Sequence, residues 1–170
     1  EAAIVNTLSP GDKVLSATAG SFGDRFIDMA QAFGAEVERL DFEWGQAVDP
    51  EAIRRALAGS PDIKAVMVTH NETSTGITND LAAIAKVVRE YDRLTLVDAI
   101  SSVGCIPVET DAWDLDVVVT GSQKGFMVPP GLAFAAVGPR AIEAAKTATL
   151  PRFYFDFNRA FTLQDQGQTP

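Results

Sequence analysis

The most constraining feature of this sequence is an alternation, from Lys13 to Gly138, of short β-branched apolar runs with segments of helical period. Such alternation is typical of βαβ units, in which helices connect parallel strands. The sequence therefore predicts an α/β fold, a three-layer α/β/α sandwich with a mainly parallel sheet. The predicted strands are residues 13–18, 35–40, 64–69, 94–98, 115–120 and 132–137.

The segments between these strands carry helix signals. Residues 79–91 place apolar side chains on one stripe and charged side chains on the opposite face. Asp49 followed by Pro50 predicts a helix start, and Ser21 with Asp24 resembles a capping box. Several strands are apolar on both faces, which predicts that helices cover both sides of the sheet.

Composition bounds the class of protein. The 170 residues are 46% hydrophobic and 22% charged, which is typical of one globular unit. With 14 Lys and Arg against 23 Asp and Glu, the net charge is −9, and no basic run offers a footprint for nucleic acid. No apolar run is long enough to cross a bilayer and no signal peptide is visible. We therefore expect neither nucleic acid nor membrane as a partner.

Cysteine usage points to a reducing compartment. Cys105 is the single cysteine, which excludes an internal disulfide and a metal site built on several thiolates within these residues. We expect a cytoplasmic protein with no metal, and we predict that Cys105 is a small buried thiol.

The two ends of the chain differ from its centre. The first residues read as the middle of a helix, and residues 151–170 are first aromatic and then polar. We expect part of a longer polypeptide, in which residues 1–150 are a cofactor-binding portion and residues 151–170 a tail.

Polar residues follow three of the predicted strands. Residues 64–69 lead into residues 70–76, residues 94–97 lead into Asp98, and residues 115–120 lead into a segment that contains Lys124. Ligands of open α/β sheets bind at the carboxyl ends of the strands, so these residues should share one edge of the sheet.

Asp98 and Lys124 are the residues of this edge most suited to chemistry. A carboxylate in the apolar setting of Asp98 needs a cationic or donor partner, although a helix N-cap or a turn could also satisfy it. Lys124 could equally be an ordinary surface lysine. Together they favour pyridoxal-phosphate chemistry, in which a lysine forms a Schiff base and a carboxylate keeps the pyridine nitrogen protonated. Burial and a nearby cation would lower the pKa of the lysine for proton transfer.

The order and spacing of four segments resemble the class V branch of the fold-type I pyridoxal-phosphate enzymes, which contains the alanine-glyoxylate and serine-pyruvate aminotransferases. The four segments are residues 8–14, 70–76, 97–102 and 121–124. The resemblance implies an incomplete large domain of that fold, with pyridoxal 5'-phosphate as cofactor and a homodimer as the assembly. The phosphate-binding loop is then expected before Glu1 and the substrate-binding arginine after Pro170.

The resemblance also implies roles for individual residues. Lys124 corresponds to the Schiff-base lysine and Asp98 to the partner of the pyridine nitrogen. Thr73 corresponds to the hydroxyl that binds the phenolic oxygen of the cofactor, and Gln123 to a cofactor contact beside the lysine. Ile100 would pack under the ring.

Phe22 has two interpretations. Related enzymes stack an aromatic ring on the cofactor at this position, which is physically reasonable for Phe22. It also belongs to the apolar stripe of its own helix, with Phe26, Met29 and Phe33. His70, the only histidine, is either structural or at the edge of the site, and Glu72 receives no role.

The resemblance implies an aminotransferase that moves an amino group from a small amino acid, of the alanine or serine type, to a 2-oxo acid such as glyoxylate or pyruvate. A cysteine desulfurase-like lyase is less favoured, because those relatives carry His where Gln123 stands. A non-catalytic nucleotide-binding module is a second alternative, although residues 18–23 contain only two glycines. Some cyanobacterial relatives are described as soluble hydrogenase subunits, and for such a name we would still expect aminotransferase chemistry.

Overall fold

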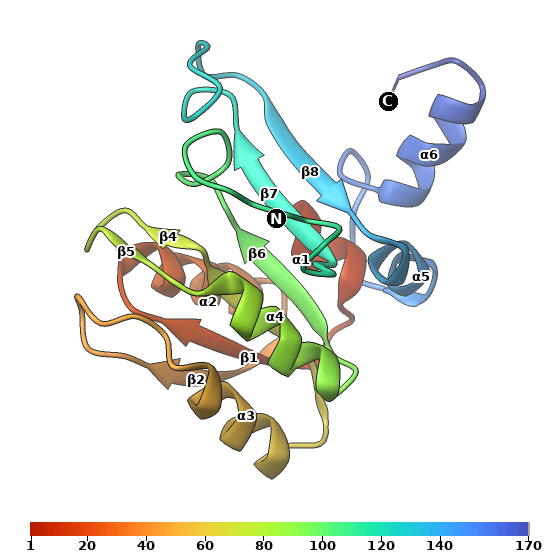
Figure 1. Cartoon of the computed structure of the whole chain (residues 1–170). Helices are drawn as coiled ribbons and strands as arrows, with labels where there is room; N and C mark the ends of the chain where they lie inside the picture. Colours follow the sequence, from red (N-terminus) through yellow and green to blue (C-terminus); the bar gives the residue numbers. More distant parts are fainter. Residues whose placement is uncertain (170) are drawn as a thin grey trace.

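The computed structural model describes residues 1–169 and contains a six-stranded sheet with helices on both faces (Figure 1). The strand order is β2-β1-β3-β6-β7-β8, in which all neighbours are parallel except β8, which runs antiparallel to β7. This confirms the predicted three-layer fold with a mainly parallel sheet. The strands are β1 (Lys13–Thr18), β2 (Glu36–Asp41), β3 (Ile63–Thr69), β6 (Leu94–Asp98), β7 (Val117–Gly121) and β8 (Ala133–Val137).

Two hydrophobic cores lie on opposite faces of this sheet. Helices α3 (Pro50–Gly59) and α4 (Leu81–Glu90) pack on one face. Helices α1 (Ala2–Thr7), α2 (Ser21–Ala32) and α5 (Pro139–Thr147) pack on the other. Because side chains alternate along a strand, the apolar residues of β3 enter the two cores in turn. The prediction that helices cover both faces is therefore confirmed.

The helix starts agree only in part with the predicted signals. The Asp49 side chain accepts a hydrogen bond from Glu51 N and Pro50 occupies the first turn of α3, as predicted. The capping box at Ser21 is wrong, because the N-cap of α2 is Gly20 and no cap side chain binds there. The first amides of α2 donate instead to the carboxylate of Glu72, which is distant in sequence.

A short hairpin and a helix in the tail were not predicted. Strands β4 (Asn71–Glu72) and β5 (Ile77–Thr78) form a short antiparallel hairpin after β3. The tail contains helix α6 (Phe157–Asp165). The amide of the fully buried Asn6 joins this tail to α1, since it donates to Phe155 O and accepts from Phe157 N at 2.8 Å. The last residue of the predicted tail, Pro170, lies outside the described residues.

None of the helices within residues 1–169 combines the length and the apolar character needed to cross a membrane.

Candidate functional site

The carboxyl ends of β3, β6 and β7 lie side by side, as the sequence predicts (Figure 1). Asp98 is opposite Thr69 of β3 and Val119 of β7 in the strand register. Beyond the strands the pairing continues, because His70 N donates to Asp98 O at 2.8 Å and Ala99 N donates to Val119 O at 2.9 Å. Side chains that follow these three strands therefore project from one edge.

A cavity of about 590 Å³ opens beside this edge, between helices α1 and α2, strands β7 and β8, and the aromatic segment before α6. Three of the predicted site residues line this Asp98 cavity, namely Asp98, Ile100 and Phe22. Most of the remaining lining is apolar, and its other charged residues are Glu1 and Arg25. An apolar cavity with a few polar groups is the usual form of a small-molecule site.

The other three predicted site residues, Thr73, Gln123 and Lys124, lie on adjoining loops. All three are exposed, and they are not among the residues that line the Asp98 cavity. The expectation that Lys124 is buried is therefore wrong within residues 1–169. No ion pair or hydrogen bond joins Lys124 to Asp98 within residues 1–169.

The loops that carry Lys124 and Asp98 are nevertheless in close contact. At Gly125 an added Cβ atom would lie 2.1 Å from Val103 O, so only glycine allows the approach after Lys124. The positive charge of Lys124 slightly offsets the burial that raises the pKa of Asp98.

The environment of Asp98 favours its neutral form. Burial raises the pKa of Asp98 above its usual value, and the nearby charge of Glu72 raises it further. The hydrogen bond from Ile100 N to Oδ1, at 2.9 Å, and the charge of Lys124 oppose this shift. The prediction that a turn could satisfy Asp98 therefore holds for Oδ1. Its other oxygen, Oδ2, has no hydrogen-bond partner among the described residues and can still accept a hydrogen bond.

Glu72 has the densest set of side-chain contacts at this edge, although the sequence reasoning gave it no role. Its side chain is fully buried, and its oxygens accept from the amides of Phe22, Gly23 and Ser74 and from the Ser74 hydroxyl. A sequence signal existed. A carboxylate three residues after a buried strand, with no Lys or Arg beside it in the sequence, indicates that its donors are backbone amides or hydroxyl groups.

Unpartnered polar atoms gather at the same edge. Among residues 1–169, four buried side-chain polar atoms have no hydrogen-bond partner, and three of them are Thr69 Oγ1, His70 Nδ1 and Thr120 Oγ1. Thr69 ends β3, His70 follows it, and Thr120 lies in β7. Since buried polar atoms are rarely left unpaired, such a cluster is typical of a functional edge.

The predictions for His70 and Cys105 differ in their outcome. His70 is buried, and burial lowers its pKa. Its ring packs edge-on against Trp113, with 6.2 Å between the ring centroids. These contacts fit the structural interpretation of His70. The prediction for Cys105 is wrong, because this thiol is exposed on the loop that follows Asp98.

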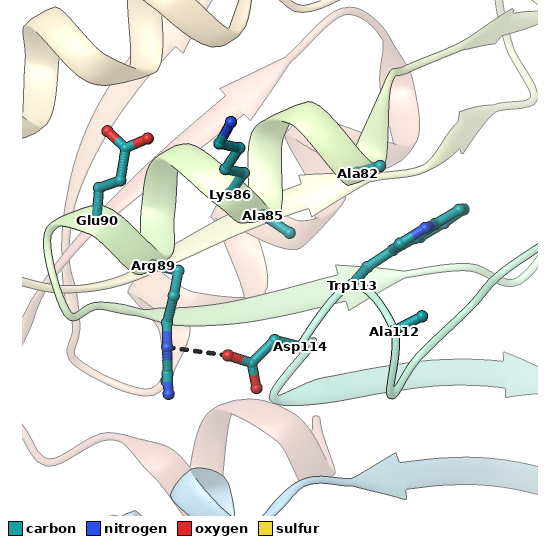
Figure 2. A pocket seen from close by; sticks show the side chains of 8 residues that line it. All are labelled: Ala82, Ala85, Lys86, Arg89, Glu90, Ala112, Trp113 and Asp114. Carbon is teal, nitrogen blue, oxygen red and sulfur yellow. Dashed lines mark ion pairs between the residues drawn. The ribbon is translucent and has the colours of Figure 1, made fainter.

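A second cavity, of about 470 Å³, lies between α4 and the loop before β7 (Figure 2). Figure 2 shows Arg89 directed at Asp114, with which it forms an ion pair of 2.9 Å. Alanines, Trp113 and side chains of α4 complete the lining. Because Asp114 pairs with Arg89 and Glu90 pairs with Arg54, this cavity lacks the free carboxylate oxygen that the Asp98 cavity has.

Residues 2–155 match the model of the aminotransferase class-V family. The chain belongs to this family. It is 47% identical, over its whole length, to a protein of Anabaena cylindrica named soluble hydrogenase 42 kDa subunit, of which it covers 45%. It is 43% identical, again over its whole length, to the serine-glyoxylate aminotransferase of Methylorubrum extorquens, of which it covers 44%.

The fold is also that of a solved family member. The crystal structure of alanine-glyoxylate aminotransferase from Nostoc sp. superposes with a TM-score of 0.93 at 34% identity, covering 99% of this chain and 45% of that one. The class V chain described here thus spans less than half the length of these relatives.

Proposed function

We propose that the complete protein is a pyridoxal-phosphate-dependent aminotransferase that moves an amino group from a small amino acid, of the alanine or serine type, to a 2-oxo acid such as glyoxylate or pyruvate. Family membership supports the reaction class. The names of the relatives support the substrates, since the Methylorubrum and Nostoc proteins share glyoxylate and differ in the amino donor.

The observation that carries this proposal is the carboxylate of Asp98 in its cavity. Pyridoxal phosphate, when bound, supplies an aldehyde that condenses with amines and a protonated ring that takes up the electron pair released at the substrate Cα. Asp98 fits such a ring, because its Oδ2 is free to accept from a ring N–H. A cationic partner would also relieve the cost of burying this carboxylate.

The remaining groups at this edge supply complementary chemistry. The amine of Lys124 provides a nucleophile and a base for the proton at the substrate Cα. The Thr73 hydroxyl can donate to a phenolic oxygen, and Gln123 provides an amide beside the lysine. Phe22 and Ile100 offer apolar surface for the two faces of a flat ring, and both line the Asp98 cavity.

The test is to trap the bound aldehyde with borohydride in the complete protein and to map the modified lysine. We expect the label at Lys124. A label at another lysine of this segment would contradict the assignment; these are Lys13, Lys64, Lys86 and Lys146. A second test is the variant Asp98→Asn, which should retain the cofactor and slow the loss of the Cα proton of the substrate. An unchanged rate of proton loss would contradict the role of Asp98.

Two alternative activities can be tested on the same purified protein. A cysteine desulfurase-like lyase would release sulfur from cysteine, and Gln123 in place of the histidine of those enzymes argues against it. The hydrogenase name of the Anabaena relative predicts a tightly bound metal. Quantifying metal and pyridoxal in the purified complete protein separates that activity from amino transfer.

We further propose that residues 1–150 form part of a large cofactor-binding domain, and that the tail leads to a C-terminal domain that supplies the substrate arginine. A homodimer is supported by the exposed apolar surface around β8, where Met127 is 89% exposed and Leu132 is 65% exposed. Its test is the molar mass of the complete protein in solution. A cytoplasmic location fits the single exposed thiol of Cys105.

A further inference from the structure

We propose that Glu72 is a positioning residue that holds together two turns at the edge of the proposed cofactor site, the turn that carries Phe22 and the turn that carries Thr73. This inference rests on the proposed function, because it concerns how those two residues are presented to pyridoxal phosphate. It assigns to Glu72 no contact with the substrate or the cofactor.

The two oxygens of Glu72 reach two separate segments of the chain. Oε2 accepts from Phe22 N at 3.1 Å and from Gly23 N at 3.0 Å. Oε1 accepts from Ser74 N at 3.1 Å and from Ser74 Oγ at 2.6 Å. One carboxylate therefore connects the first turn of α2 to the hairpin that carries Thr73.

The two segments are also in close steric contact. A Cβ atom added at Gly20 would lie 2.5 Å from Ser74 Oγ and 2.6 Å from Glu72 Cγ. The Ser74 hydroxyl also accepts from Ser21 N at 3.0 Å. We call this contact between residues 20–23 and residues 72–75 the Glu72 joint. It leaves little freedom for either turn to move alone.

The chemistry of Glu72 explains why a carboxylate occupies this position. The amino-terminal amides of a helix have no partners within the helix and carry a partial positive charge. A fully buried carboxylate bonded to such amides is well stabilised without a basic side chain. An amide side chain of the same size has only one acceptor oxygen for the four donors, and its NH₂ group would face an N–H.

The location of the Glu72 joint ties it to the proposed site. Phe22 lies at the first turn of α2 and lines the Asp98 cavity, and its amide is bonded directly to Glu72. Thr73 is flanked by Glu72 itself and by Ser74, whose amide and hydroxyl are both held. The negative charge of Glu72 also affects the site, because it contributes to the raised pKa of Asp98.

The experiment compares Glu72→Gln with Asp116→Asn in the complete protein. Asp116 is the matched control, since it is also a buried carboxylate that accepts from a backbone amide, Thr95 N at 2.7 Å, but it lies at the opposite edge of the sheet. The first measurement is amide hydrogen exchange in the cofactor-free protein. Glu72→Gln should speed exchange at Phe22, Gly23 and Ser74 by at least about tenfold, whereas Asp116→Asn should leave these amides unchanged.

The second measurement is binding of pyridoxal phosphate, together with the circular dichroism of the bound cofactor. Glu72→Gln should weaken binding by about tenfold and reduce the dichroic band, whereas Asp116→Asn should alter neither. If Glu72→Gln does not fold, Ser74→Ala replaces it. That variant keeps the carboxylate, and the expected changes are in the same direction and about threefold.

The outcomes separate this inference from the proposed function. If the unaltered protein does not bind pyridoxal phosphate, the proposed function fails and the inference with it. If binding and dichroism are the same in Glu72→Gln as in the unaltered protein, the inference fails while the proposed function stands. Equal losses in Glu72→Gln and Asp116→Asn would also overturn the inference, because they would indicate general destabilisation.

Discussion

Asp98, a half-buried carboxylate at the end of β6, and Asp116, a buried carboxylate just before the neighbouring strand β7, both have a pKa that burial raises. Asp116 directly precedes β7, is 3% exposed, and is closed in by Thr95 N at 2.7 Å and by the Arg140 guanidinium at 3.7 Å. Asp98 ends β6, accepts only from Ile100 N among the described residues, and lines a cavity. Burial and a raised pKa therefore do not identify a ligand site by themselves. The feature that supports the proposed role of Asp98 is its free acceptor oxygen beside a cavity.

The direction of the strands explains the difference. Asp116 lies at the amino edge of the parallel strands, where Arg140 and a backbone amide complete its contacts. Asp98 lies at the carboxyl edge, where the loops diverge and leave space for ligands. If this contrast is functional, substitutions at the carboxyl edge should affect chemistry, and matched substitutions at the amino edge should affect stability.

The largest effect is expected from two lysines, one at each edge. Lys124→Ala in the complete protein should reduce turnover by on the order of 10³-fold or more, because it removes the proposed nucleophile and base. Lys64→Ala at the start of β3 removes an ion pair with Asp12 of 2.6 Å and should cost less than about 1 kcal/mol of stability, with turnover unchanged. Steady-state kinetics and urea unfolding of both variants measure this. Comparable turnover losses in the two variants would remove the contrast.

The two aspartates themselves provide the next test. Asp98→Ala should weaken binding of pyridoxal phosphate between about tenfold and a hundredfold, because a charge-assisted hydrogen bond is lost, and should change stability by less than about 1 kcal/mol. Asp116→Ala should leave binding unchanged and lower the free energy of unfolding by about 1 to 3 kcal/mol, because Thr95 N loses its acceptor. Cofactor titration gives the affinity for pyridoxal phosphate, and urea unfolding gives the free energy of unfolding, for each variant. The opposite pattern would show that Asp116 belongs to the site.

The fold could be predicted from the sequence because each strand and helix carries its own signal. The strand β6 has the predicted bounds, and Asp49 caps α3 as predicted. What the sequence could not reveal depends on residues far apart in the chain. The cap of α2 comes from Glu72, about 50 positions after the helix start, so that a local motif at Ser21 was mistaken for it.

The placement of the candidate site residues could be predicted in part, for a similar reason. Strand order brings Asp98 to the carboxyl edge of the sheet, because parallel strands align their carboxyl ends. The exposure of Lys124 and of Cys105 depends on which segments pack around their loops, and local sequence contains no such information. Nothing near Cys105 in the sequence favours a thiolate, which led to the prediction of a buried thiol, and that prediction is wrong.

A smaller effect should appear in the pH dependence of stability. The pKa of Asp98 is raised in the folded protein, so between its unfolded value of about 3.9 and its raised value the folded state holds more protons than the unfolded state. Stability is therefore lost as the pH rises through this window. Asp98→Asn removes the loss and should therefore stabilise the cofactor-free protein at pH 7.

The measurement for this prediction is the urea midpoint of the two proteins between pH 4 and pH 7. The advantage of Asp98→Asn should shrink toward zero as the pH falls. The exposed Asp28 of α2 provides the control, and Asp28→Asn should differ little from the unaltered protein. An advantage of Asp98→Asn that is constant with pH would indicate that it does not arise from the buried charge.

The smallest expected effect concerns the other face of the carboxyl edge, where His70 packs against Trp113. Burial lowers the pKa of His70, so the unfolded chain takes up a proton near pH 6.5 before the folded one does. Stability is therefore lost as the pH falls from 7 through that window. His70→Phe keeps an aromatic ring beside Trp113 and should abolish this dependence in urea unfolding. If the dependence persists, His70 does not cause it; if His70→Phe also slows turnover, then His70 serves the site, and the carboxyl edge is functional on both faces of the sheet.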